Sequence, residues 1–237
     1  MAISLNIAAM QVGAALNAID PTQYSFGQTL SGTGVLNDSE RRAVQEIYDA
    51  LVSADGDVVR LICQTPGHGH RRDFFTAQTN VTHTGQLNSR IGPVESVIFS
   101  ITGGSAPGPR PAVEFDKLEI YYENLNPMGL ISVDPHYSVE GETVYHNGAA
   151  LAAITGGVVS VNVTFCAYAR SNANPPVLQS PDEYTNPVVA KALAMLFAKE
   201  GHHTEAGGFY EQVWQAYAKD IAEGATSLRS LPALAQG

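Results

Sequence analysis

The residues with the clearest potential for chemistry lie in the segment Gly67-His-Gly-His-Arg-Arg-Asp73. Two imidazoles separated by one residue can share a face of an extended segment and bind a metal ion, with Asp73 as a third ligand. No second cluster of ligands in the sequence completes such a site, and glycine flanks each histidine. We therefore favour an exposed polar loop over a metal site at His68 and His70.

Other sequence signatures of catalysis are missing. The chain has no Gly-x-Ser-x-Gly nucleophile elbow, no Walker-type phosphate loop and no Gly-x-Gly-x-x-Gly after a strand. Asp134 and His136 are an acid and a base two positions apart, but a chain with 7 histidines contains such neighbours by chance. We therefore predict no catalytic residue, no cofactor and no enzymatic activity.

The composition limits the partners of the protein. The 237 residues include 13 Lys and Arg against 23 Asp and Glu, which gives a net charge of -10. A chain of this charge is unsuited to gripping phosphate, so nucleic acid can pass nearby without being bound. Cys63 and Cys166 lack the paired spacing of a zinc site and are too few for a disulfide framework, so we expect two buried thiols.

The apolar opening of the chain, Met1 to Ile19, does not have the features of a secretory signal. No basic residue precedes Arg41, so the segment lacks a positive flank. We predict an amphipathic helix or arm and no membrane span, in a soluble protein made inside a cell. The apolar residues that recur at helical spacing are Leu5, Ala8, Val12, Ala15 and Ile19.

The densest helical signals lie between Ser180 and Glu223. Ser180-Pro-Asp-Glu183 matches a capping box with proline at the first helical position, and Asn186-Pro187 offers a second start one turn later. Two apolar faces follow, separated by Gly201, so we predict an antiparallel helical hairpin with Trp214 in its core. The faces consist of Val189, Leu193, Leu196 and Phe197 in the first helix and Phe209, Val213, Tyr217 and Ile221 in the second.

A third helix is predicted earlier in the chain. It begins after the cap Asn37-Asp-Ser-Glu40 and ends at Ala54-Asp-Gly-Asp57, which we expect to break it. The apolar run from Val58 to Ile62 is then a further helix turn or a first strand. The buried face of this third helix consists of Val44, Ile47, Tyr48 and Leu51.

The middle of the chain has the alternation of β-strands. Alternating apolar residues predict strands at Val97 to Ile101, at Leu118 to Tyr122 and, most clearly, at Val159 to Ala169. Turn residues predict exposed loops at Thr102 to Pro111 and at Asn124 to Glu142. We therefore predict an α+β fold in which an antiparallel β-rich region is inserted into a helical bundle. The expected parts are an N-terminal arm (1–36), a bundle (37–66 and 180–223), the β-rich region (67–179) and a C-terminal docking tail (224–237).

The order of these elements resembles the head-to-tail adaptor, or connector, proteins of tailed bacteriophages. The resemblance covers about Asp38 to Val52 and Pro181 to Ile221, and the β region agrees in type only. The Pro181-Asp-Glu-Tyr184 entry, the Lys199-Glu-Gly201 turn and the pattern from Ala206 to Tyr210 look like the closing segment of many adaptors.

This resemblance implies a structural virion protein. Adaptors form a ring, usually twelvefold, between the portal and the tail and conduct DNA without catalysis. The implied partners are further copies of the chain in a dodecamer, the portal protein, and tail or nozzle proteins. DNA would pass through without being specifically bound, and no membrane is involved. The implied location is the virion neck, after assembly in the host cytoplasm.

The tail after Glu223 is the segment that the resemblance assigns to the portal, because C-terminal docking is common in the family. The alternative is a tail that is disordered. The residues that we assign to the portal contact are Leu228, Arg229, Leu231 and Leu234.

Two other functions remain open. One is a different phage structural protein, such as a tail or decoration component that uses its sheet for contacts and differs from an adaptor in ring symmetry. The other is a small metal-dependent hydrolase at His68, His70 and Asp73, which metal bound after purification would favour.

Overall fold

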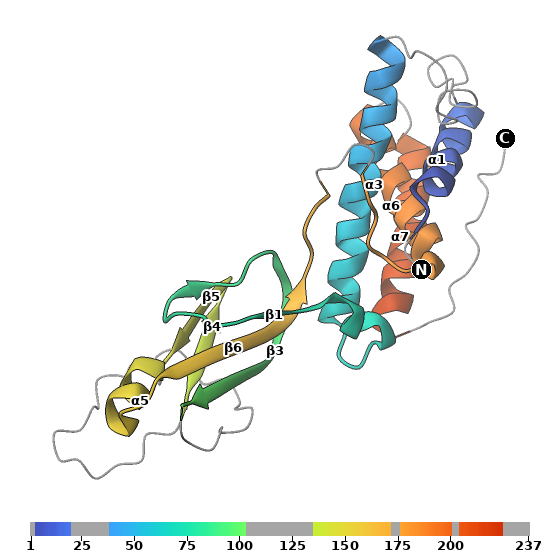
Figure 1. Ribbon diagram of the computed structural model, residues 1–237. Helices are drawn as coiled ribbons and strands as arrows, with labels where there is room; N and C mark the ends of the chain where they lie inside the picture. The colour runs from blue at the N-terminus through green and yellow to red at the C-terminus, as the bar shows by residue number, and fades with distance from the viewer. Residues whose placement is uncertain (1–2, 20–37, 103–134, 172–175, 201–203, 225–237) are drawn as a thin grey trace. The chain divides into compact units, whose positions relative to one another are not determined.

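The computed structural model describes residues 3–19, 38–102, 135–171, 176–200 and 204–224 (Figure 1). The chain divides into two compact units. The helical unit combines Met1–Arg71 with Ala169–Gly237, and the β unit is the continuous segment Arg72–Tyr168. Segments from before and after the β unit therefore belong to one unit, and the predicted α+β class is confirmed.

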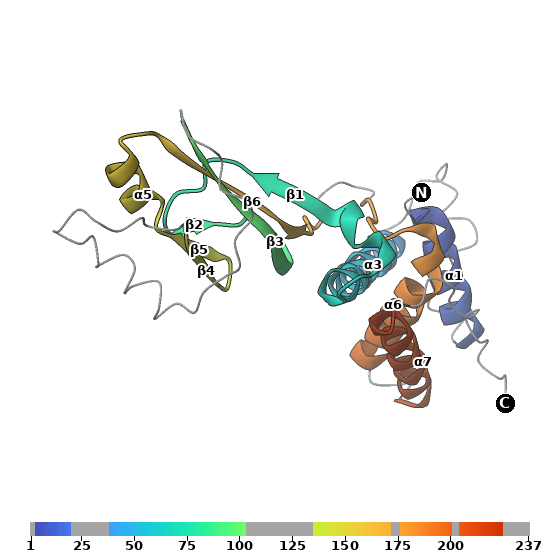
Figure 2. The same cartoon turned by 90° about the horizontal axis from the view of Figure 1, so that it is seen from below.

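The helical unit is built around one central helix. Helix α6 (Thr185–Glu200) contacts α1 (Leu5–Ile19), α3 (Asp38–Gln64) and α7 (Thr204–Ala222), and Figures 1 and 2 show it beside all three. A helix with neighbours on several sides must be apolar around most of its circumference. The predicted face of α6 is buried, and its buried residues also include Val188, Ala190, Ala192 and Ala194.

The predicted hairpin forms, but the buried face of α7 differs from the prediction. Phe209 and Val213 are only half-buried, whereas Trp214 is 6% exposed, as expected for a core residue. The two possible stripes share Tyr217 and Ile221 and both have helical spacing, so the sequence pattern does not distinguish them. The buried stripe consists of Ala206, Tyr210, Trp214, Tyr217 and Ile221.

Helix α3 is continuous, so the predicted break at Ala54-Asp-Gly-Asp57 is wrong. The carboxylate of Asp55 accepts hydrogen bonds from the backbone N–H groups of Gln179 at 2.8 Å and Ser180 at 2.9 Å. Gly56 costs a helix interior about 1 kcal/mol, which the burial of the apolar face beyond it exceeds. That face continues with Val58, Val59 and Ile62, all at 0% exposure.

The predicted capping box at Ser180 also does not form. The Ser180 side chain is buried and its Oγ has no hydrogen-bond partner among the described residues. The short 3₁₀ helix η2 (Asp182–Tyr184) comes first, and α6 begins at Thr185, close to the second predicted start. Ser180 is held through its backbone instead, since its carbonyl accepts from the N–H of Ile3 at 3.0 Å.

The N-terminal segment forms the predicted helix, α1, within the bundle. Ala8, Val12 and Leu16 of its inner face are at most 1% exposed. Within the described ranges, no helix combines the length and the apolar content needed to cross a lipid bilayer.

The β unit contains two antiparallel three-stranded sheets. One has the order β1 (Phe75–Gln78), β6 (Val159–Ala167), β3 (Arg90–Ile101), and the other has the order β2 (Gly85–Gln86), β5 (Thr143–His146), β4 (Tyr137–Glu140). The predicted strands at β3 and β6 form and pair with each other over Val94–Ile101 and Val159–Phe165. Their buried side chains share one core, which includes Val97, Phe99, Val144, Val161, Val163 and Phe165.

Two features of the β unit were not predicted. The segment expected to be an exposed loop up to Glu142 contains strand β4, because Tyr137 is 5% exposed in the core and pairs with His146. Helix α5 (Gly148–Thr155) precedes β6 and buries Leu151 in the same core. The predicted strand at Leu118 to Tyr122, and all but the first residue of the predicted loop at Thr102 to Pro111, lie outside the described residues.

Candidate functional site

The two histidines of the Gly67–Asp73 segment lie in the helical unit, just after α3. Gly67 has a φ of +77°, and the 3₁₀ helix η1 (Gly69–Phe74) follows it. His68 is only 4% exposed, so the prediction of an exposed loop is wrong at this residue. The reason is Tyr184, at 0% exposure in η2, which contacts the His68 ring.

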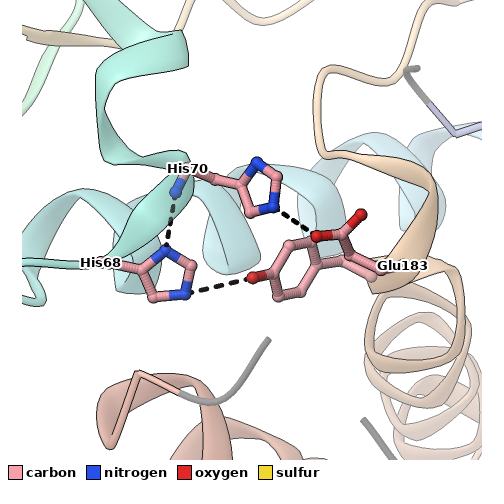
Figure 3. A network of polar contacts seen from close by, with 4 residues as sticks. His68, His70 and Glu183 are labelled. Carbon is pink, nitrogen blue, oxygen red and sulfur yellow. Dashed lines mark hydrogen bonds and ion pairs between the residues drawn. The ribbon is translucent and has the colours of Figure 1, made fainter. Parts of the chain in front are cut away.

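His68 uses both of its ring nitrogens (Figure 3). Its Nδ1 accepts a hydrogen bond from the backbone N–H of His70 at 3.3 Å, and its Nε2 lies 3.1 Å from the hydroxyl oxygen of Tyr184. A ring that accepts at Nδ1 carries its proton on Nε2 when neutral. The neutral His68 ring therefore donates from Nε2 to the Tyr184 oxygen.

His70 provides a second link between the same two short helices. Its Nε2 contacts Oε1 of Glu183, which precedes Tyr184 in η2 (Figure 3). When His70 is protonated, this contact is an ion pair between partly exposed groups. The four residues thus form one polar network that joins η1 to η2, which we call the histidine network.

Burial sets the protonation states in the histidine network. It raises the pKa of Tyr184 to about 12, with a further contribution from the Glu183 charge, so the hydroxyl stays protonated at physiological pH. Burial also lowers the pKa of His68, the neighbouring His70 lowers it further, and Glu183 opposes both. His68 is therefore held in its neutral form.

The histidines of the metal hypothesis make other contacts in this structure. Both nitrogens of His68 are occupied, and Nε2 of His70 contacts a carboxylate. Among the described residues, no group of three or more His, Cys, Asp or Glu side chains is placed to hold a metal ion. Asp73, the third ligand of the metal hypothesis, does not belong to such a group.

A second anchor, centred on Asp55 of α3, holds the backbone of the segment that precedes η2. Asp55 has 0% exposure and its two oxygens hold the backbone of Gln179 and Ser180. The side-chain amide of Gln179 donates to the carbonyl of Ala169 at 2.6 Å. Since the chain leaves the helical unit after Arg71 and returns at Ala169, residues 179–184 hold the chain close to both crossing points.

Asp55, Glu183 and Tyr184 are the members of these anchors that the sequence did not reveal. Asp55 contacts residues 124 and 125 positions away, and Tyr184 lies 116 positions from His68. Asp182 and Glu183 fit the acidic first turn of a helix equally well. The one sequence feature that pointed to this region was the histidine-containing segment Gly67–Asp73.

A second buried histidine lies in the core of the β unit. His146 is 5% exposed, its Nε2 lies 2.9 Å from the carbonyl of Val81, and its Nδ1 accepts from the N–H of Gly148 at 3.1 Å. Burial lowers its pKa. Because both nitrogens hold backbone groups, His146 has a structural role.

The predicted portal-contact residues, Leu228, Arg229, Leu231 and Leu234, lie outside the described residues, as does Asp134. No protein-family model matches the chain, and no curated protein matches it significantly in sequence.

Proposed function

We propose that this protein is a structural component of a phage virion, a head-to-tail adaptor that forms a ring between the portal and the tail. The observation that carries the proposal is the chain order. Early and late helices, α3, α6 and α7, pack in one unit, and the β unit is a continuous insertion between them. This is the arrangement that the resemblance of Asp38–Val52 and Pro181–Ile221 to adaptors implies.

The charge of the chain supports a passive role toward DNA. Each copy carries a net charge of -10, so a ring of copies would repel phosphate along its lumen and let DNA slide. The partners in this proposal are further copies in a dodecamer, the portal protein on one side and tail or nozzle proteins on the other. The ring would be assembled in the host cytoplasm and reside in the virion neck.

The portal contact is assigned to the C-terminal residues Leu228, Arg229, Leu231 and Leu234. A short segment with spaced leucines can dock in an apolar groove of a partner. The β unit would supply the contacts to tail components.

Ring formation can be tested with the purified full-length chain, alone and with its portal protein, by mass photometry and electron microscopy. We expect particles with a mass that is an integer multiple of 25.2 kDa, added to the portal as a closed ring. A chain that stays monomeric with the portal, and is absent from the neck in a reconstruction of the virion, would refute the proposal. A ring elsewhere in the particle would favour the tail or decoration alternative.

The portal contact can be tested with two matched variants. One replaces Leu228, Leu231 and Leu234 with aspartate, and the other places the same three charges at Ser227, Ser230 and Ala235. We expect the first variant to lose portal binding and the second to retain most of it. Equal loss in both variants would attribute the effect to charge and remove the assignment to the leucines.

A further inference from the structure

The histidine network lies where the chain leaves the helical unit. His68 and His70 belong to the helical unit, whereas Arg72 is the first residue of the β unit, so η1 spans the boundary along the chain. Among the described contacts, η1 is joined to η2 through the pairs His68–Tyr184 and His70–Glu183 (Figure 3). Both of these links between η1 and η2 use an imidazole group.

The hydrogen bonds of His68 fit only one protonation state. Nδ1 must be unprotonated to accept the N–H of His70, which lies 3.3 Å away. A proton on Nδ1 would place two N–H groups against each other and leave a buried donor without an acceptor, which is costly. At Nε2 nothing changes, because the ring donates to Tyr184 in either state.

The charged groups around His68 come from both short helices. His70 in η1 repels a charge on the ring when it is protonated itself, and Glu183 in η2 attracts that charge. Tyr184 makes the direct contact and stays neutral. Protonation of His70 strengthens its pair with Glu183, so Glu183 is then less able to compensate a charge on His68.

We propose that the histidine network contains a proton-operated latch, in which protonation of His68 breaks its bond from the His70 backbone and loosens the first turn of η1. This turn is then ordered in neutral solution and loosened in acid. This inference rests on the contacts within the helical unit and holds whether or not the protein is an adaptor.

The direction of the pH dependence follows from the difference in proton binding between the closed and the open latch. Burial lowers the pKa of His68 below its ordinary value of 6.5, so the unlatched state binds protons more readily. The latch is therefore fully closed above pH 6.5 and opens as the pH falls below it. Tyr184 does not contribute, because its pKa is about 12.

Hydrogen exchange of the full-length chain at pH 7.5 and pH 5.0, corrected for intrinsic rates, tests the latch directly. We expect the amides of η1, including that of His70, to lose protection by about tenfold at pH 5.0, the equilibrium value of one hydrogen bond. Amides in the centre of α6 should keep their protection. Unchanged protection in η1 across this range would overturn the proposal.

Two substitutions identify the titrating group. His68→Asn retains an acceptor oxygen near the position of Nδ1 but does not titrate, so its η1 protection should no longer depend on pH. His70→Gln retains the backbone donor and removes the other imidazole, so the pH response should remain. The opposite pattern, with a response in His68→Asn and none in His70→Gln, would assign the trigger to His70 and overturn the proposal.

A measurement on the unaltered protein covers the case in which His68→Asn does not fold. Nitrogen-15 spectra of the imidazole rings report tautomer and protonation directly. We expect His68 to carry its proton on Nε2 at pH 7.5 and to titrate together with the loss of η1 protection. A His68 ring that is protonated while η1 remains protected would show that the latch does not open.

Discussion

The hydroxyl oxygen of Tyr184 lies 3.1 Å from Nε2 of His68, although the two residues are 116 positions apart. This contact joins the helix that follows α3 to the helix that precedes α6. Both side chains are almost completely buried, at 0% and 4% exposure. A polar pair removed from water to this extent stabilises the fold only while both partners are present.

Tyr184→Phe tests the strength of this contact. The substitution leaves the His68 Nε2–H without its acceptor, so we expect the helical unit to lose about 1–3 kcal/mol of unfolding free energy. Trp214 is the only tryptophan of the chain and is buried in this unit, so its fluorescence during urea unfolding is a suitable measurement. Tyr48→Phe is the control, because Tyr48 is half-buried and its hydroxyl makes no hydrogen bond among the described residues. Equal losses in both variants would contradict the assignment.

Asp55→Ala should be among the most destabilising single changes in the helical unit. It leaves the buried N–H of Ser180 and the partly buried N–H of Gln179 without acceptors, for a loss of about 2–5 kcal/mol. Asp57→Ala is a matched control two positions later, since among the described residues Asp57 forms only a partly exposed pair with Arg60 at 3.6 Å, worth about 0–1 kcal/mol. The same urea unfolding curves compare the two, and a small effect of Asp55→Ala would show that α3 does not need this anchor.

Acid should destabilise the β unit through His146. Burial lowers the pKa of His146 in the folded state below 6.5, so the unfolded chain binds more protons. The unfolding free energy of this unit should therefore be at its full value above pH 6.5 and decrease as the pH falls below it. Urea unfolding followed by circular dichroism between pH 5 and 8 measures this slope, and His146→Gln should reduce it. An unchanged slope in that variant would exclude His146 as the titrating residue.

Two glycine substitutions should have opposite effects. Gly208 lies in α7 with no atom within 4 Å of an added Cβ, so Gly208→Ala should stabilise the helical unit by about 0.5–1 kcal/mol. Gly85 would place a Cβ 2.7 Å from the carbonyl oxygen of Thr82, so Gly85→Ala should destabilise the β unit. Trp214 fluorescence measures the first effect. The second is measured by the reaction of buried Cys166 with a thiol reagent in a Cys63→Ser background, and slower reaction in Gly85→Ala would contradict it.

Local patterns in the sequence were sufficient for most of the elements. Period-two alternation identified β6, and helical spacing identified α1, α6 and the start of α3. A helix or strand that buries one face has apolar residues at a regular spacing in the sequence, so the pattern can be read without the structure. The same patterns failed where two solutions were locally equivalent. In α7 two stripes shared Tyr217 and Ile221, and at Gly56 the break signal was outweighed by the burial of Val58, Val59 and Ile62.

The α+β class, the insertion of strands between helices and the two buried thiols follow from residue types and their spacing alone. The burial of His68 against Tyr184 and the hold of Asp55 on the backbone of Ser180 become apparent only in the folded chain. Such contacts depend on packing that brings distant positions together. A histidine or an aspartate in a turn-like segment has the same local signature whether water or a residue more than a hundred positions away completes its hydrogen bonds.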